Sequence, residues 1–164
     1  MVFSGKFLGI DYGTKRIGVA ISDENGTLAF PKEIILNDAN TFNRFAEIIE
    51  KENIGEIVVG ESMDFSGKLN ALSARIEVFI LELKEKFSAQ GGPASGGKLV
   101  IHKQKEFLTS VEARKSKDTK KSLSPSQAHS KVKQIKSGRI DASAAALILQ
   151  RYLDKKNQTA SNSI

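Results

Sequence analysis

Residues 8–23 read LGIDYGTKRIGVAISD, in which two apolar runs flank a short polar turn. The runs 7–10 and 17–21 have strand-like composition, and glycine stands at positions 9, 13 and 18. Apolar runs separated by turn-forming residues predict a β-hairpin, and glycine permits a tight turn with its backbone close to a phosphate. One carboxylate, Asp11, lies in this apolar setting. We therefore expect two antiparallel strands with an acid at the end of the first.

The rest of the chain alternates between strand and helix patterns. Asn25 and Gly26 form a strong hairpin signal before a third strand over 28–36, where Pro31 indicates an edge or a bulge. Further expected elements are helices over 41–53 (N-cap Thr41), 69–87 and 140–153, strands over 56–62 and 98–103, a loop over 88–97, and a helix start at Thr109 with Glu112. The order β-β-β-α-β-α-β-α predicts an α/β fold with a mixed five-stranded sheet, three antiparallel strands and then parallel ones, flanked by helices.

Composition narrows the class of protein. The chain has 164 residues, no cysteine and two histidines, which excludes disulfides, thiolate metal sites and most zinc sites. The first residues contain no run long enough for a signal peptide or a membrane span, so we expect a soluble cytoplasmic protein without membrane contact. The length predicts one domain over 1–154 followed by a polar tail over 155–164.

Charge points to a polyanionic partner. Lys and Arg number 25 against 19 Asp and Glu, a net charge of +6, although a merely soluble basic protein has the same balance. The segment 114–139 holds nine of these cations against the single acid Asp118. It reads as a flexible basic loop or as a helix that orders on a partner. Its candidate nucleic-acid contacts are Arg114, Lys115, Lys133, Lys136 and Arg139.

Four carboxylates are candidates for a site: Asp11 at the end of the first strand, Glu61 at the end of the fourth, Glu106 shortly after the fifth, and Asp141 in the first turn of the last helix. Each has an ordinary alternative as a turn former, a surface acid or a helix cap. If the strand ends converge, the acids form a cluster that repels itself unless cations bind. Mg²⁺ or Mn²⁺ held by carboxylates beside a basic surface indicates two-metal phosphodiester hydrolysis, with ions about 4 Å apart.

The stretches LGIDYGTKRIGVAISD and IDASAAALILQRYL resemble the first-strand motif and the closing helix of the YqgF (RuvX) family of ribonuclease-H-like nucleases. Members of that family are described as pre-16S ribosomal RNA nucleases and as Holliday junction resolvases. The resemblance spans most of residues 6–153 and implies a ribonuclease-H-like fold. It implies Asp11 and Asp141 as metal ligands, Glu106 as the middle ligand, and Lys15 and Arg16 as contacts to a phosphate backbone.

Two departures from the family pattern concern the middle acid. After the fifth strand the family has an Asp-Glu-Arg run, where this chain has Lys105, Glu106 and Phe107. At the fourth strand the family has Gly-Leu-Pro, where this chain has Gly60, Glu61 and Ser62. Glu61 is therefore a second candidate, because the related RuvC resolvases take an acid from the fourth strand.

The leading hypothesis is a Mg²⁺- or Mn²⁺-dependent nuclease acting on rRNA precursor or on a four-way DNA junction. One alternative is a nucleic-acid-binding protein of the same fold with a weakened site, motivated by Lys105 and by the long basic segment 114–139. A second is an ATP-binding phosphotransferase, because GIDYGT also resembles the first phosphate loop of the actin, sugar-kinase and Hsp70 superfamily; the single domain argues against it. Paired cuts across a four-way junction favour a homodimer, whereas trimming the end of an rRNA needs only a monomer. The sequence is therefore consistent with either oligomeric state.

Overall fold

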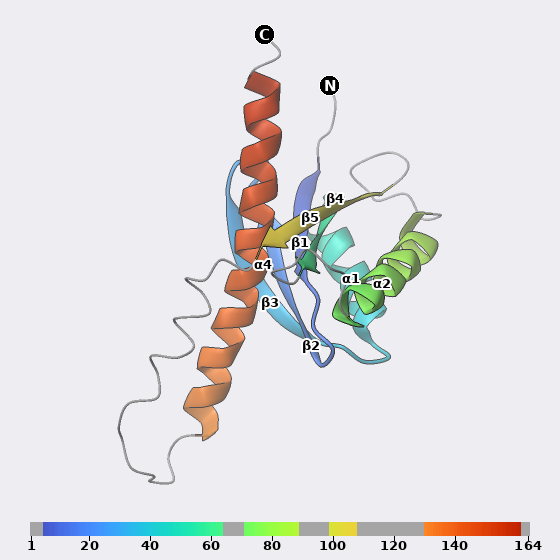
Figure 1. Ribbon diagram of the computed structural model, residues 1–164, viewed down its shortest axis with the longest axis vertical. Coiled ribbons are helices and arrows are strands. Elements are labelled where there is room, and N and C mark those ends of the chain that lie inside the picture. The colour runs from blue at the N-terminus through green and yellow to red at the C-terminus, as the bar shows by residue number, and fades with distance from the viewer. Residues whose placement is uncertain (1–4, 64–70, 89–98, 108–129, 162–164) are drawn as a thin grey trace.

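The computed structural model describes residues 5–63, 71–88, 99–107 and 130–161, and within them every side chain except those of 62, 63, 88, 106, 107 and 130–141. The elements are β1 (Lys6–Asp11), β2 (Arg16–Ser22), β3 (Ala29–Leu36), α1 (Thr41–Lys51), β4 (Ile54–Met63), α2 (Ala71–Ser88), β5 (Val100–Phe107) and α4 (Ser130–Ser161) (Figure 1). The predicted element order is confirmed. The predicted loop over 88–97 lies almost wholly outside the described residues, as do the helix start at Thr109 and the basic positions Arg114 and Lys115.

The strands form one mixed sheet in the order β3-β2-β1-β4-β5. β1 is antiparallel to β2 and parallel to β4, β2 is antiparallel to β3, and β4 is parallel to β5. This is the predicted α/β arrangement, a mixed five-stranded sheet with three antiparallel strands followed by parallel ones. The register of β2 and β3 shifts between Val19 and Ala20, opposite the part of β3 that holds Pro31, as a proline in an edge strand favours.

Helices cover both faces of the sheet (Figure 1). On one face, α1 and α2 pack against alternate strand residues, with Phe45 and Leu83 fully buried against Leu8 and Ile10. On the other face, α4 packs through its apolar stripe against the intervening residues of the strands. Strand side chains alternate between faces, so each strand residue belongs either to the α1/α2 face or to the α4 face.

Two glycines let α4 lie close to the sheet. A Cβ on Gly9 would lie 2.7 Å from the Cβ of Leu149 and 3.0 Å from the carbonyl oxygen of Ala145. A Cβ on Gly60 would lie 2.6 Å from Cδ1 of Ile148. The interpretation of Gly9 as part of a phosphate-binding turn is therefore wrong, because Gly9 lies within β1 and makes room for α4.

The differences from the predicted element boundaries that matter most concern β5, α4 and the N-cap of α1. β5 continues to Phe107, so Glu106 lies within the strand and not after it. α4 begins at Ser130 and ends at Ser161, longer at both ends than the predicted 140–153, since Lys and Gln, which favour helices, flank the apolar part. The N-cap of α1 is Asn40, whereas Thr41 is buried and its hydroxyl donates to the carbonyl oxygen of Leu36.

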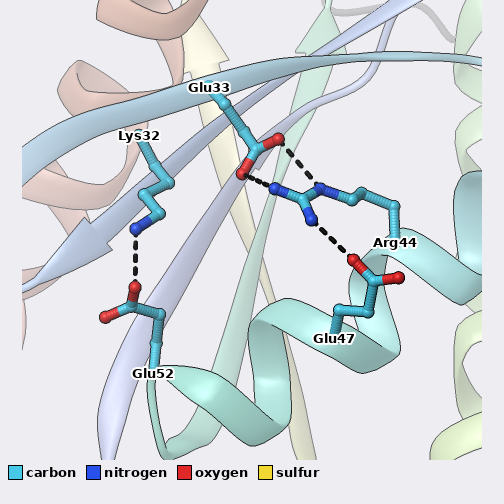
Figure 2. A network of polar contacts seen from close by, with 5 residues as sticks. All are labelled: Lys32, Glu33, Arg44, Glu47 and Glu52. Carbon is cyan, nitrogen blue, oxygen red and sulfur yellow. Dashed lines mark hydrogen bonds and ion pairs between the residues drawn. The ribbon is translucent and has the colours of Figure 1, made fainter.

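Ion pairs join edge strand β3 to α1 and the residue after it (Figure 2). The Arg44 guanidinium donates to both carboxylate oxygens of Glu33, at 3.0 and 2.8 Å, and to Glu47 at 2.6 Å. Lys32 donates to Glu52 over 2.6 Å. These hydrogen bonds raise the pKa of Arg44, and the one from Lys32 lowers the pKa of Glu52. The cations Lys32 and Arg44 are therefore already matched by acids.

Candidate active site

Asp11 is the last residue of β1 and is half-buried. It lies opposite Gly18 of β2, and one residue beyond Ile10, which is in register with Val59 of β4. Leu8 and Ile10 belong to the α1/α2 face, whereas Phe7 and Gly9 meet α4. Alternation along the strand therefore assigns Asp11 to the α4 face, at the carboxyl end of β1.

The turn after Asp11 connects β1 to β2. Gly13 is required there, because a Cβ at that position would collide with the carbonyl oxygen of Arg16. The Tyr12 ring packs against Phe79 of α2, with centroids 4.9 Å apart. Lys15 and Arg16 are both exposed, as the predicted phosphate contacts require. The side chain of Asn37 braces the turn by donating to the carbonyl oxygen of Gly13 over 2.9 Å.

Glu61 and Lys105 are in register on neighbouring parallel strands, β4 and β5. Glu61 is at an alternate position of β4 after Ile57 and Val59, so it lies on the same face as these residues, which are in the core beneath α1 and α2. Lys105 continues the series of Lys103, which pairs with Glu77 of α2. Both belong to the α1/α2 face, so Glu61 lies on the opposite face of the sheet from Asp11.

Position 106 belongs to the α4 face. In β5 it lies four positions after His102 and therefore on the same face of the sheet. The His102 ring lies 5.0 Å from that of Tyr152 in α4. The register partner of position 106 is Ser62, which continues the series of Gly60 in β4. Position 106 and Asp11 thus share one face and the carboxyl end of the parallel strands. They are two strands apart, about 10 Å across the sheet, and position 106 lies two residues beyond Gln104, the residue of β5 that is level with Asp11.

α4 runs antiparallel to β1. The Phe7 ring lies 6.0 Å from that of Tyr152, whereas Gly9 meets Leu149 and Ala145, which come earlier in the helix. The N-terminal direction of α4 is therefore the carboxyl direction of β1. Position 141 is helical and lies one turn, about 6 Å, before Ala145 on the same side of the helix.

The backbone thus brings three of the four candidate positions, 11, 106 and 141, to one end of the α4 face, and leaves Glu61 on the other face. The side chains of Asp11 and Glu61 are described, and those of 106, 133, 136, 139 and 141 lie outside the described set. Among the described side chains no group of three acids or histidines is spaced to hold a metal ion.

A second polar cluster lies at the other end of the same face, and nothing in the sequence pattern indicated it. Glu56 of β4 lies 2.6 Å from Nε2 of His102 and accepts a hydrogen bond from Lys156 over 3.1 Å. The Lys156 ammonium also lies 4.2 Å from the centre of the Phe7 ring. The hydrogen bond with His102, and then that from Lys156, lowers the pKa of Glu56, while burial raises the pKa of Tyr152. This cluster fastens the C-terminal half of α4 to β4 and β5.

Comparison with known proteins agrees with these observations. A family model described as "RuvX: Holliday junction resolvase" matches residues 5–155. The chain belongs to the RuvX family. The RuvX match covers every described strand and reaches from the first residue before β1 into the C-terminal half of α4.

Curated relatives agree with membership of the RuvX family. A protein of Thermoanaerobacter pseudethanolicus named "Putative pre-16S rRNA nuclease" is 35% identical over 153 residues, which is 92% of this chain and 97% of that protein. A protein of Chlorobaculum tepidum with the same name is 34% identical over 155 residues, 91% of this chain and 93% of its own length. Both the family description and the relatives' name denote enzymes that cut nucleic acid.

A solved structure of RuvC from Thermus thermophilus aligns with 94% of this chain and 97% of its own, with 12% sequence identity and a TM-score of 0.45. In the described part of this RuvX-family chain, no helix is both long enough and apolar enough to cross a membrane.

Proposed function

We propose that this protein is a Mg²⁺- or Mn²⁺-dependent nuclease that hydrolyses phosphodiester bonds in structured nucleic acid. The observation that carries the proposal is the shared location of Asp11, position 106 and position 141 on the α4 face, at the carboxyl edge of β1, β4 and β5. These positions hold Asp, Glu and Asp.

The fit to a metal site follows from the chemistry of these residues. Three carboxylates in one place repel one another, and the cost is offset when divalent cations with oxygen preference bind between them. Divalent ions held by these carboxylates would supply Lewis-acid activation of water and charge stabilisation for the leaving oxygen. The role of Asp11, Glu106 and Asp141 is to hold these ions at the edge of the sheet. In the overall reaction, water adds to phosphorus, one P–O ester bond breaks, and the released oxygen takes a proton.

The distribution of charge supports binding of nucleic acid on the α4 side. α4 contains seven Lys or Arg against two Asp, whereas α1 contains two of each sign and α2 three of each sign. A polyanion is therefore attracted to the face that holds Asp11 and not to the face covered by α1 and α2. Lys133, Lys136 and Arg139 belong to α4 and precede Asp141, so their sequence positions suit contacts to a backbone near the site.

The location of Lys105 bears on the alternative of a weakened site. In the sequence Lys105 directly precedes Glu106, and a cation beside Glu106 would weaken metal binding. Lys105 lies two positions after Lys103 in β5 and therefore on the same α1/α2 face, so the sheet separates it from Asp11. This supports an active site with Glu106 as the middle acid, and it makes Glu61 a weaker candidate.

Two substrates are consistent with the printed names of the relatives, a 16S rRNA precursor and a four-way DNA junction. The test is cleavage of both labelled substrates in parallel with Mg²⁺ and with Mn²⁺. We expect the wild type to cut at least one, and Asp11→Asn or Asp141→Asn to reduce the rate at least a hundredfold with an unchanged circular dichroism spectrum. Metal-dependent cleavage that persists in both variants contradicts the proposal. Tight, salt-sensitive binding by the wild type without any cleavage supports the alternative of a binding protein.

A further inference from the structure

Asn37, which directly follows β3, joins both ends of the turn between β1 and β2. Its side-chain Nδ2 donates to the carbonyl oxygen of Gly13 over 2.9 Å. Its backbone N–H donates to the carbonyl oxygen of Lys15 over 3.0 Å. A single residue therefore holds the two carbonyl groups on either side of Thr14. The turn begins directly after Asp11.

Asn37 is itself held by a rigid support. The Thr41 hydroxyl, which is buried, donates to the carbonyl oxygen of Leu36 over 3.0 Å and accepts from the Asp38 N–H over 2.9 Å. The Asp38 carboxylate accepts from the N–H of Asn40 over 2.8 Å. The residues on both sides of Asn37 are thus fixed to the start of α1. A continuous set of hydrogen bonds connects α1, Asn37 and the turn.

Lys15 is the cation that this turn presents. It is exposed and makes no ion pair with any residue that the structure describes. Several other lysines and an arginine differ in this respect, because each has an acidic partner: Lys6, Lys32, Arg44, Lys103 and Lys156. A cation without an acidic partner, in a turn that hydrogen bonds already hold, is suited to binding a phosphate. Binding then does not have to offset the entropy cost of ordering the turn.

We propose that Asn37 is a positioning residue for nucleic-acid binding, which holds the turn so that Lys15 meets a substrate phosphate beside Asp11. This inference rests on the proposed function. Asn37 touches no substrate in this account and acts only through the turn. Loss of its side-chain hydrogen bond would leave the bond from its backbone N–H in place, so the turn would loosen at Gly13 and remain tethered at Lys15.

The test is a double-mutant cycle on affinity, with a labelled four-way junction and an rRNA precursor in EDTA so that no cleavage occurs. The full chain is compared as wild type, Asn37→Ala, Lys15→Ala and the double variant, across a range of salt concentrations. We expect Asn37→Ala to weaken binding roughly threefold to tenfold, the size expected for one neutral hydrogen bond. We expect Lys15→Ala to weaken it as well and to reduce the salt slope by about one. The double variant should bind no more weakly than Lys15→Ala.

A merely structural role for Asn37 predicts a different pattern. In that case Asn37→Ala lowers the melting temperature, and its effect on affinity is absent or is the same with and without Lys15, which would overturn the inference. Asn43→Ala is the matched control, because Asn43 is exposed on α1 and takes no part in the hydrogen bonds that hold Asn37 and the turn. If Asn37→Ala melts below the assay temperature, Asn37→Ser serves in the same cycle. A wild type that binds neither substrate overturns the proposed function as well, whereas a wild type that binds with additive variants overturns only this inference.

Discussion

Gly9 of β1 and Leu149 of α4 approach so closely that a Cβ on the glycine would lie 2.7 Å from the Cβ of the leucine. The same added atom would lie 3.0 Å from the backbone oxygen of Ala145. Neither of these atoms can move without the helix, so the contact sets the separation between β1 and α4. Because Asp11 follows Gly9 by two residues and Asp141 precedes Ala145 by one turn, this separation also sets the spacing of two candidate ligands.

Gly9→Ala should therefore impair cleavage more than stability. Overpacking of this kind costs roughly 1–3 kcal/mol of unfolding free energy, and the helix relieves it by moving away from β1. We expect a clear rise in the metal concentration needed for half-maximal cleavage, measured beside urea denaturation. Gly60→Ala is the control, because the three atoms nearest to its Cβ would all belong to the side chain of Ile148, with Cδ1 at 2.6 Å and Cγ1 at 3.2 Å. This side chain can change rotamer, whereas the atoms that face Gly9 include the backbone oxygen of Ala145. Equal effects of the two variants on metal requirement would contradict this account.

Glu106→Gln and Glu61→Gln separate the two candidates for the middle ligand. Glu61 is in register with Lys105 on the α1/α2 face, whereas position 106 shares the face of Asp11. We expect Glu106→Gln to lower the metal-dependent cleavage rate by at least a hundredfold and Glu61→Gln to change it less than threefold. Each variant keeps the size of the side chain and removes only the charge. Loss of cleavage in Glu61→Gln with retention in Glu106→Gln would reverse the assignment.

The cluster around Glu56 predicts a dependence of stability on acid. The pKa of the Glu56 carboxyl is lowered in the folded protein from its ordinary value of 4.5. The hydrogen bond with His102 is the larger cause, and the one from Lys156 also contributes. A group with a lowered folded pKa stabilises the fold above its unfolded pKa, and this stabilisation is lost as pH falls through the folded value. The wild type should therefore lose unfolding free energy below about pH 4.5.

The Glu56→Gln variant isolates the contribution of the Glu56 carboxylate. It should have a lower unfolding free energy than the wild type at pH 7, and this difference in free energy should shrink as the pH falls from about 5 to about 3. Urea denaturation at several pH values measures both quantities. A difference that stays constant over this range would show that the carboxylate charge of Glu56 does not stabilise the fold.

The element order could be predicted because each element has a local signal. The glycine-rich turn between two apolar runs indicated β1 and β2, and the alternation of apolar residues at helical spacing indicated α1 and α2. The ends of the elements were harder to predict than their order. β5 continues through Lys105 and Glu106, whose charges do not resemble a strand, because pairing with β4 supplies the hydrogen bonds that hold them extended.

Contacts between distant parts of the chain left no local signal. Glu56, His102 and Lys156 are far apart in sequence, and only the packing of α4 on the sheet joins them. The brace from Asn37 to Gly13 is of the same kind, because the residue reads in sequence as an ordinary polar position after a strand.

By itself the sequence determined the family, the order of the elements and the identity of the acids at the strand ends, because these depend on local composition and on motifs carried by neighbouring residues. Only the tertiary structure decided which acids share a face. Adjacent residues of a strand point to opposite sides of the sheet, so Lys105 and Glu106, neighbours in sequence, belong to different faces. The register of β4 with β5 and the close packing of α4 on Gly9 together assign position 106 to the side of Asp11, and Glu61 to the other.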